Sequence, residues 1–281
     1  MGVTDELTII LNNLSVSYTD EGRDNDLAII FIHGFPLDKS MWYEQRRALR
    51  DKYRVITYDI RGFGSSGIGK DEFSIDLFAT DLMHFMDALK LDKVVLCGLS
   101  MGGYIALNAM RIFSDRIVGL ILCDTQCAAD TPDAKRNRIK TIEMVQHNGL
   151  ELYADKALSS LFYSESMDKK SKQIIATRAV IESSSPFVIC NTLLALADRE
   201  DMCDTLPNID IPTLILVGEE DTITPPERAE LMHSKISGST LYKIGQAGHL
   251  SNIDNPEVFN RHVNGFLKGI VKQRSHLPTP S

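Results

Sequence analysis

The pentapeptide GLSMG at residues 98–102 places Ser100 between two glycines, directly after the apolar run 93–97 and directly before a helical pattern. A serine in this strand–turn–helix context acts as a nucleophile, because the tight turn exposes its hydroxyl at the carboxyl edge of a sheet. The free N–H groups at the start of the following helix suit a developing oxyanion. We therefore predict that Ser100 is the nucleophile of a hydrolytic enzyme.

A serine hydroxyl is a poor nucleophile unless a base takes its proton. Among the seven histidines, His249 lies just past the last predicted strand and before the final predicted helix. A loop at that edge of the sheet can bring the imidazole to Ser100. We predict that His249 is the base.

The imidazole in turn needs a carboxylate that holds its tautomer and stabilises its charged form. Asp221 follows the strand predicted at 213–217, which gives the chain order serine, acid, histidine. Glu219 and Glu220 adjoin it, and Asp124 ends the preceding predicted strand at the same edge of the sheet. We predict Asp221 as the acid and retain Asp124 as the alternative.

Acyl transfer also needs donors that face the tetrahedral oxygen. The backbone N–H of Met101, directly after the serine, is one candidate. The second is the N–H of Phe35, because the loop HGFP at 33–36 follows a predicted strand and is stiffened by Gly34 and Pro36. We predict that both backbone groups form the oxyanion hole.

Short apolar runs alternate with helical patterns along the chain, which indicates a mostly parallel sheet covered by helices. We predict eight strands and, between them, five helices that flank the sheet. An Asn-Asn turn joins the first two strands into an antiparallel edge hairpin. The strands are predicted at 8–11, 14–18, 27–32, 53–58, 93–97, 117–123, 213–217 and 240–244, and the helices at 40–50, 75–89, 101–113, 226–234 and 256–271.

The segment 127–207 breaks this alternation, because it contains helical stretches and no strand-like run. One helix can begin at Pro132 and end at Asn148-Gly149, and two more are predicted at 174–182 and 188–197. We interpret 127–207 as a helical cap inserted into a core formed by 1–126 and 208–281.

Substrate contacts are expected from that cap. Apolar cap residues such as Phe162 and Phe187 can line a substrate pocket, although packing within the cap explains any one of them as well. Arg136, Arg138 and Arg178 can hold a substrate carboxylate, and solvated helix faces explain them equally.

Several motifs together resemble the α/β-hydrolase superfamily: HGFP, DIRGFGSSG, GLSMGG, GEEDTITPP and AGHLSNIDNPEVFN. Within it they are similar to the branch of 3-oxoadipate enol-lactonases, small carboxylesterases and cofactor-free haloperoxidases or perhydrolases. The resemblance covers the sheet portion and implies the α/β-hydrolase fold. It also implies Ser100, Asp221 and His249 as the catalytic triad, with Phe35 and Met101 as oxyanion donors.

The expected function is the cleavage of a small-molecule carboxylic ester or lactone through an acyl-enzyme intermediate, without a cofactor. The same residues could serve perhydrolysis or C–C bond hydrolysis. A ligand receptor with slow turnover is the alternative from another class. The oligomeric state stays open.

Other classes of function lack support in the sequence. The stretch 62–67 matches G-x-G-x-x-G, but the loop continues past the last glycine, whereas a dinucleotide site needs a helix to begin there. No His, Cys and acid cluster has zinc spacing, so no metal is predicted. The net charge of −8 argues against nucleic acid as the main partner.

Location is inferred from the absence of signals and from the cysteines. The N-terminus lacks the pattern of a secretory signal, and no apolar run reaches the ~20 residues of a spanning helix, so no membrane partner is expected. The five cysteines are an odd number, and Cys97 and Cys123 lie in strand-like runs where a buried thiol acts as a small hydrophobe. Reduced cysteines and no export signal suggest the cytoplasm.

Overall fold

The computed structural model describes residues 6–166 and 171–275, in which eight strands form one sheet. Their order across the sheet is β1-β2-β4-β3-β5-β6-β7-β8. The pairs β1–β2 and β2–β4 are antiparallel, and all other neighbours are parallel. The strands are β1 (Leu7–Leu11), β2 (Leu14–Glu21), β3 (Ala28–Ile32), β4 (Arg54–Tyr58), β5 (Val94–Leu99), β6 (Ile117–Cys123), β7 (Thr213–Gly218) and β8 (Thr240–Ile244).

Burial of the strands follows their sequences. The central strands β3, β5 and β7 are continuous apolar runs and are buried at every residue, as expected for parallel strands covered on both faces. The edge strand β1 alternates between exposed and partly buried residues. Asn12 and Asn13 both have positive φ, 46° and 72°, which is the backbone that a two-residue hairpin turn requires. The predicted edge hairpin is therefore confirmed.

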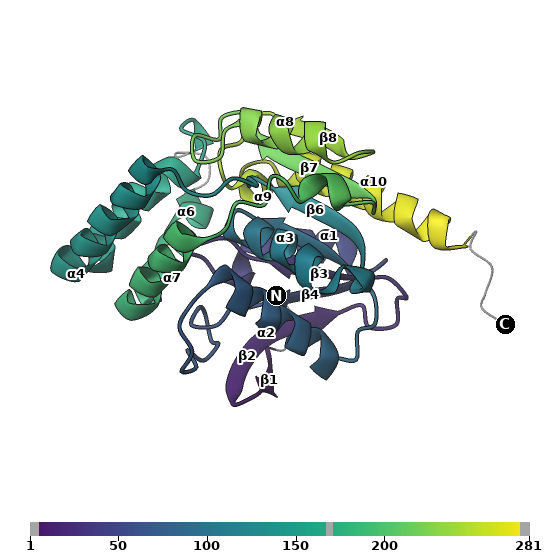
Figure 1. The fold of residues 1–281 in the computed structure, drawn as a ribbon, viewed down its shortest axis with the longest axis horizontal. Coiled ribbons are helices and arrows are strands. Elements are labelled where there is room, and N and C mark those ends of the chain that lie inside the picture. Colours follow the sequence, from purple (N-terminus) through teal and green to yellow (C-terminus); the bar gives the residue numbers. More distant parts are fainter. Residues whose placement is uncertain (1–5, 167–170, 276–281) are drawn as a thin grey trace.

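Helices cover the sheet in two groups (Figure 1). Helices α2 and α3 pack against each other, and α3 contacts β3, β5 and β6, whereas α1 packs against α10, which contacts β6, β7 and β8. The helices that flank the sheet are α1 (Tyr43–Leu49), α2 (Ile75–Ala88), α3 (Met101–Phe113), α8 (Pro226–Lys235), α9 (Ser251–Asp254) and α10 (Pro256–Ser275), with short 3-10 helices η1 (Lys39–Trp42), η2 (Ser114–Arg116) and η3 (Leu206–Asn208).

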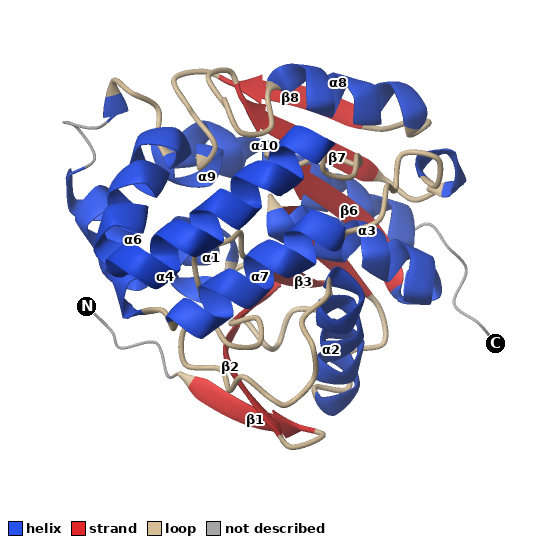
Figure 2. Cartoon of the chain, turned by 60° about the vertical axis from the view of Figure 1, so that its left-hand side comes forward, coloured by secondary structure: helices blue, strands red, loops and turns tan. Residues whose placement is uncertain are grey.

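In the described part of the chain between β6 and β7 lie three helices, which we call the inserted helices: α4 (Pro132–Leu161), α6 (Ser171–Ser183) and α7 (Pro186–Asp198). They stand together beside the sheet (Figure 1) and cross in front of it in the turned view (Figure 2). Within the described residues, no single helix is long and apolar enough to cross a membrane; α6 and α7 pass only as a pair bent by 95°. The division of the chain into a cap at 127–207 and a core at 1–126 and 208–281 stays a prediction.

The longest of these helices differs from its predicted form. Helix α4 begins at Pro132, as predicted, and the Thr131 side chain accepts a hydrogen bond from the N–H of Ala134. At Gly149 the backbone leaves the helical region, with φ 78° and ψ −173°, but the helix resumes and continues to Leu161. The Asn-Gly signal that predicts a helix end therefore marks a kink, because a second helical arm follows directly.

A disulfide joins Cys127 and Cys203, which are 76 residues apart in sequence. The two cysteines flank the inserted helices, and the N–H of Met202 donates to the Cys127 carbonyl at 2.9 Å beside the bond. The expectation that the cysteines are reduced is therefore wrong for this pair. Cys97, Cys123 and Cys190 are buried free thiols. A cytoplasmic location, which depended partly on reduced cysteines, stays a prediction.

Removing the disulfide with the double variant Cys127→Ala/Cys203→Ala should lower the free energy of unfolding by roughly 2–4 kcal/mol, because the bond restricts the unfolded chain. Urea unfolding measures the change, and Cys190→Ala, which keeps the disulfide, serves as the control. Unfolded, unreduced protein should titrate three thiols, those of Cys97, Cys123 and Cys190. Titration of all five cysteines would contradict the disulfide.

Candidate active site

Ser100 occupies the tight turn that joins β5 to α3. Its φ of 54° and ψ of −114° lie in a region that residues with a side chain rarely adopt. A Cβ at Gly98 would lie 2.1 Å from the Gly102 carbonyl oxygen, and one at Gly102 would lie 2.2 Å from the Ile32 carbonyl oxygen. Both flanking glycines are therefore required for the turn to form, as the G-x-S-x-G pattern predicts.

Ser100, His249 and Asp221 form a continuous hydrogen-bonded series. The Ser100 hydroxyl lies 2.8 Å from Nε2 of His249, and Nδ1 of His249 lies 2.8 Å from Oδ2 of Asp221. His249 and Asp221 are almost completely buried, at 2% and 3% exposed. The structure thus brings together the three residues that the sequence predicts as nucleophile, base and acid, from the loops after β5, β8 and β7.

The Asp221 carboxylate is held in place by the turn that follows it. Oδ1 accepts the N–H groups of Ile223 and Thr224 at 2.8 and 3.0 Å, and Oδ2 accepts the Thr224 hydroxyl at 2.8 Å. Burial opposes ionisation, but the attraction of the imidazolium that His249 forms on protonation, the His249 hydrogen bond and the Thr224 hydrogen bonds outweigh it and keep the pKa of Asp221 below its usual value. An ionised Asp221 accepts the Nδ1–H of His249, which leaves Nε2 free to accept the Ser100 proton.

Asp124, the alternative acid, faces other partners. Its Oδ1 accepts the N–H of Gly218 at 2.8 Å, and its Oδ2 accepts the Ser251 hydroxyl. Complete burial and the nearby charge of Asp221 raise the pKa of Asp124 well above its usual value. Asp124 therefore joins the end of β7 to the segment after His249, while Asp221 contacts the imidazole itself.

The two predicted oxyanion donors lie beside the serine. Phe35 and Met101 line the same cavity as Ser100 and His249. A Cβ on Gly34 would lie 3.4 Å from the Ser100 Cβ, so the loop after β3 passes directly over the serine turn. In the part of the chain that the structure describes, neither N–H donates a hydrogen bond to another backbone group outside the regular elements. Both groups are thus available to a ligand in the cavity.

His33 fastens the Phe35 loop to the loop after β4. Its Nε2 accepts the N–H of Ile60 at 3.0 Å, so the proton must be on Nδ1, which donates to the Gly34 carbonyl at 3.0 Å. Burial lowers the pKa of His33, so the ring is neutral. The Phe63 ring packs edge-on against Phe35 at 6.2 Å. The loop after β4, which contains the G-x-G-x-x-G stretch, therefore supports the Phe35 loop.

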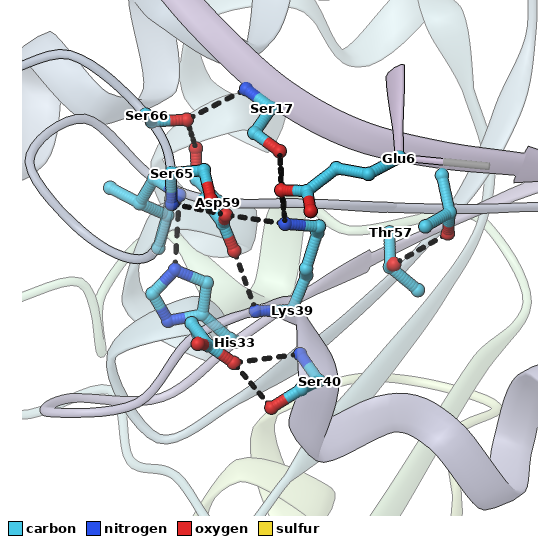
Figure 3. Close-up of polar contacts among 12 residues, drawn as sticks. Glu6, Ser17, His33, Lys39, Ser40, Thr57, Asp59, Ser65 and Ser66 are labelled. Carbon is cyan, nitrogen blue, oxygen red and sulfur yellow. Dashed lines mark hydrogen bonds and ion pairs between the residues drawn. The ribbon is translucent and has the colours of Figure 1, made fainter. Parts of the chain in front are cut away.

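A buried ion pair supports the same two loops (Figure 3). The Lys39 ammonium lies 2.7 Å from Asp59 and 2.8 Å from Glu6, and it donates to the Ser17 hydroxyl at 2.9 Å. Asp59 is fully buried, and its carboxylate also accepts the N–H groups of Lys39 and Ser65. The Asp59 carboxylate thus connects the start of η1 to the loop after β4.

The cavity in front of Ser100 has a volume of about 540 Å³. The kink at Gly149 divides α4 into two parts, which we call its arms, and both arms line the cavity. Helix α7 contributes Leu193 and Leu196, and the arms of α4 contribute the polar and apolar residues Ala134, Asn137, Arg138, Thr141, Met144, Tyr153, Lys156, Ala157, Ser160 and Leu161. Asn137, Thr141 and Met144 recur at helical spacing, as do Tyr153, Lys156 and Ser160, so each arm presents one face to the cavity.

A cluster of two arginines and one aspartate reaches this cavity through Arg138. The buried Asp130 carboxylate is shared by the guanidinium groups of Arg138 and Arg199, so the cluster retains a net positive charge. Burial opposes ionisation of Asp130, but the two guanidiniums outweigh it and lower its pKa. Arg199 also lies 4.4 Å above the Tyr104 ring, on the helix that follows Ser100. The described residues that line the cavity include Arg138 and Lys156 and no carboxylate.

The two apolar cap residues chosen from the sequence do not line this cavity. Phe162 is buried where α4 ends, and Phe187 is 59% exposed at the start of α7. Sequence analysis missed Tyr153 and Lys156 as cavity residues. A helical-wheel analysis of each arm of α4, separated at Gly149, would have found them. Arg136 and Arg178 pair with Asp133 and Asp155 away from the cavity.

Comparison with known proteins identifies the family. The profile of the family described as alpha/beta hydrolase fold matches residues 28–256. The chain belongs to the α/β-hydrolase family. Within the described residues, no three His, Cys, Asp or Glu side chains are grouped in a way that could hold a metal ion.

Individual members of the α/β-hydrolase family align over nearly the whole chain. 3-Oxoadipate enol-lactonase 1 of Acinetobacter baylyi is 31% identical over 91% of this chain and 94% of its own length. A thermophilic esterase from Thermogutta terrifontis, solved with malate bound, is 36% identical with a TM-score of 0.89, covering 95% of this chain and 99% of its own. The enol-lactonase from Burkholderia xenovorans is 26% identical with a TM-score of 0.87, covering 93% of this chain and 100% of its own.

The geometry predicts different effects for the two buried acids. Asp221→Asn should reduce kcat by up to about 10⁴-fold, because an amide does not hold the His249 tautomer or stabilise the imidazolium. Asp124→Asn keeps an oxygen for the Gly218 N–H and should cost far less, because Asp124 contacts Gly218 and Ser251 instead of the imidazole. Steady-state kinetics on a p-nitrophenyl ester measures both. A larger loss of kcat for Asp124→Asn than for Asp221→Asn would assign the role of the acid to Asp124.

Proposed function

We propose that this protein is a serine hydrolase that cleaves a carboxylic ester or lactone of a small molecule through an acyl-enzyme intermediate. The observation that carries the proposal is the hydrogen-bonded series from Ser100 through His249 to Asp221, which opens into a cavity. Similarity to enol-lactonases and to an esterase supports the same reaction class.

In the first step, Nε2 of His249 takes the proton of the Ser100 hydroxyl while the oxygen attacks the substrate carbonyl carbon. The negative charge that develops on the carbonyl oxygen is stabilised by the N–H groups of Phe35 and Met101, each worth about 2.7–4 kcal/mol of barrier by analogy with measured oxyanion donors. The imidazolium then gives its proton to the leaving oxygen as the ester bond breaks. In a lactone, the released alcohol stays attached to the acyl group.

In the second step, His249 takes a proton from a water molecule, which attacks the acyl carbon bonded to Ser100. The proton passes from His249 to the Ser100 oxygen as the acyl–oxygen bond breaks. The carboxylic acid product leaves, and the serine is restored. Asp221 stays ionised throughout and stabilises the imidazolium in both steps.

We further propose that the inserted helices act as a cap that selects a substrate bearing a carboxylate. Arg138 and Lys156 supply positive charge to a cavity whose described lining contains no carboxylate. The similar esterase from Thermogutta terrifontis was solved with malate, a dicarboxylate. The Acinetobacter relative is named for 3-oxoadipate, which is also a dicarboxylate.

Purified protein should hydrolyse short p-nitrophenyl esters with continuous turnover, and Ser100→Ala should abolish that activity because it removes the nucleophile. Product release is followed by absorbance over many enzyme equivalents, with circular dichroism of the variant as a folding control. A ligand receptor would release one equivalent of product and then stop. Undiminished turnover by Ser100→Ala would refute the mechanism.

Lys156→Gln should lower kcat/KM by up to about fivefold for an ester that carries a free carboxylate, as expected for a partly exposed ion pair. It should leave kcat/KM unchanged for the same substrate with that carboxylate blocked as a methyl ester. Lys140→Gln, on the same helix but outside the cavity lining, is the matched control. Equal effects of both variants on both esters would refute the carboxylate preference.

A further inference from the structure

The backbone on both sides of His249 is connected to the end of helix α4 and the residues after it, directly on one side and through Asp254 on the other. On one side, the Leu250 N–H donates to the Leu161 carbonyl at 3.0 Å. On the other, the N–H of Gly248 donates to Oδ2 of Asp254 at 2.9 Å, and the same oxygen accepts the N–H of Tyr163 at 2.9 Å. The loop of the proposed base is therefore attached to the inserted helices as well as to the sheet.

Beside the Asp254 bridge, the backbone at Gly248 also packs directly against the backbone of residues 162–163. A Cβ on Gly248 would lie 2.8 Å from the Tyr163 nitrogen and 2.9 Å from the Phe162 carbonyl carbon. Such distances leave no room for a side chain at 248. The position of residues 162–163 therefore limits the position of the peptide that precedes His249.

Asp254 is well suited to hold this contact together. It is 6% exposed and ends the short helix α9, which begins two residues after His249. A buried carboxylate loses its hydration and needs hydrogen-bond donors in return, and donors to a charged group form stronger bonds than donors to a neutral one. One oxygen that accepts two N–H groups from segments 85 residues apart (163 and 248) acts as a bridge between them.

A second carboxylate fixes the same loop from the opposite direction. Asp124 accepts the Ser251 hydroxyl and the N–H of Gly218, which attaches the segment after His249 to the end of β7 and so to the loop of Asp221. The imidazole needs correct distances to Ser100 and Asp221 together. Asp124 secures the loop to the sheet, and Asp254 secures it to the inserted helices.

We propose that Asp254 is a positioning residue that couples the placement of the inserted helices to the alignment of His249 with Ser100. This inference rests on the proposed function, because it assigns a role within the same site. A misplacement of about 1 Å in a reacting group can reduce a rate by about 10²-fold. Loss of the bridge should therefore act on the chemical step, through His249, more than on substrate binding.

The test compares Asp254→Ala, Asp254→Asn and Gly248→Ala with the wild-type protein. Asp254→Ala removes the bridging oxygen, Asp254→Asn keeps a carbonyl oxygen that can accept both N–H groups, and Gly248→Ala forces the two backbones apart. The matched control is Asp20→Asn, which weakens the ion pairs of the Asp20 carboxylate on strand β2 with Arg23 and with Arg54 on strand β4. Each is assayed for kcat and KM on p-nitrophenyl acetate, butyrate and hexanoate, for the rate of labelling by a fluorophosphonate, and for Tm.

Asp254→Ala and Gly248→Ala should lower kcat by roughly 10–100-fold, by the same factor for all three esters and with little change in KM. Fluorophosphonate labelling, which also needs an aligned base, should slow by a similar factor. Asp254→Asn should recover most of the lost rate. Asp20→Asn should lower Tm and leave kcat unchanged.

Two results would overturn the coupling in an active enzyme. One is a fall in Tm for Asp254→Ala with wild-type kcat, which makes the residue purely structural. The other is a KM of Asp254→Ala that rises with acyl length while kcat stays constant, which would make Asp254 a determinant of cavity shape. A wild-type protein that neither hydrolyses esters nor takes the probe would instead overturn the proposed function, and the coupling with it.

Discussion

The site depends on one strained residue, Ser100, whose positive φ points its hydroxyl outward between β5 and α3. That backbone is held by its surroundings. Gly98 contacts the start of α3 and Gly102 contacts the end of β3, at distances that no side chain would allow. The parallel pairing of β3 with β5 brings those segments together. The sheet thus imposes the serine conformation, and the exposed hydroxyl follows from it.

The other groups of the site are placed by loops at the same edge of the sheet, and buried carboxyl groups hold those loops in position. Asp221 follows β7, and its carboxylate accepts three donors from its own turn. Asp124 and Asp254 attach the His249 loop to the sheet and to the inserted helices. Lys39 and Asp59 do the same for the loop that carries Phe35. Each buried carboxylate is compensated by hydrogen bonds or by a cation, as burial requires.

Much of this could be predicted from the sequence, because the signals are local. Asn12-Asn13 defines the edge hairpin, and the glycines around Ser100 define the turn of the serine. The contacts that the sequence did not predict join distant segments. Nothing local connects Cys127 with Cys203, or Asp254 with the Tyr163 N–H that it accepts. The kink at Gly149 also changes which helical face meets the cavity, so apolar character alone pointed to Phe162 and Phe187 instead of Tyr153 and Lys156.

The central claim is that Ser100 carries the acyl group during turnover. Acid quenching of the protein during steady-state hydrolysis of a slowly deacylated ester, followed by peptide mass spectrometry, tests it most directly. The account predicts that the acyl mass is found on the peptide that contains Ser100. An acyl adduct on a different residue, or continuing turnover with no adduct on that peptide under conditions where deacylation limits the rate, would contradict it.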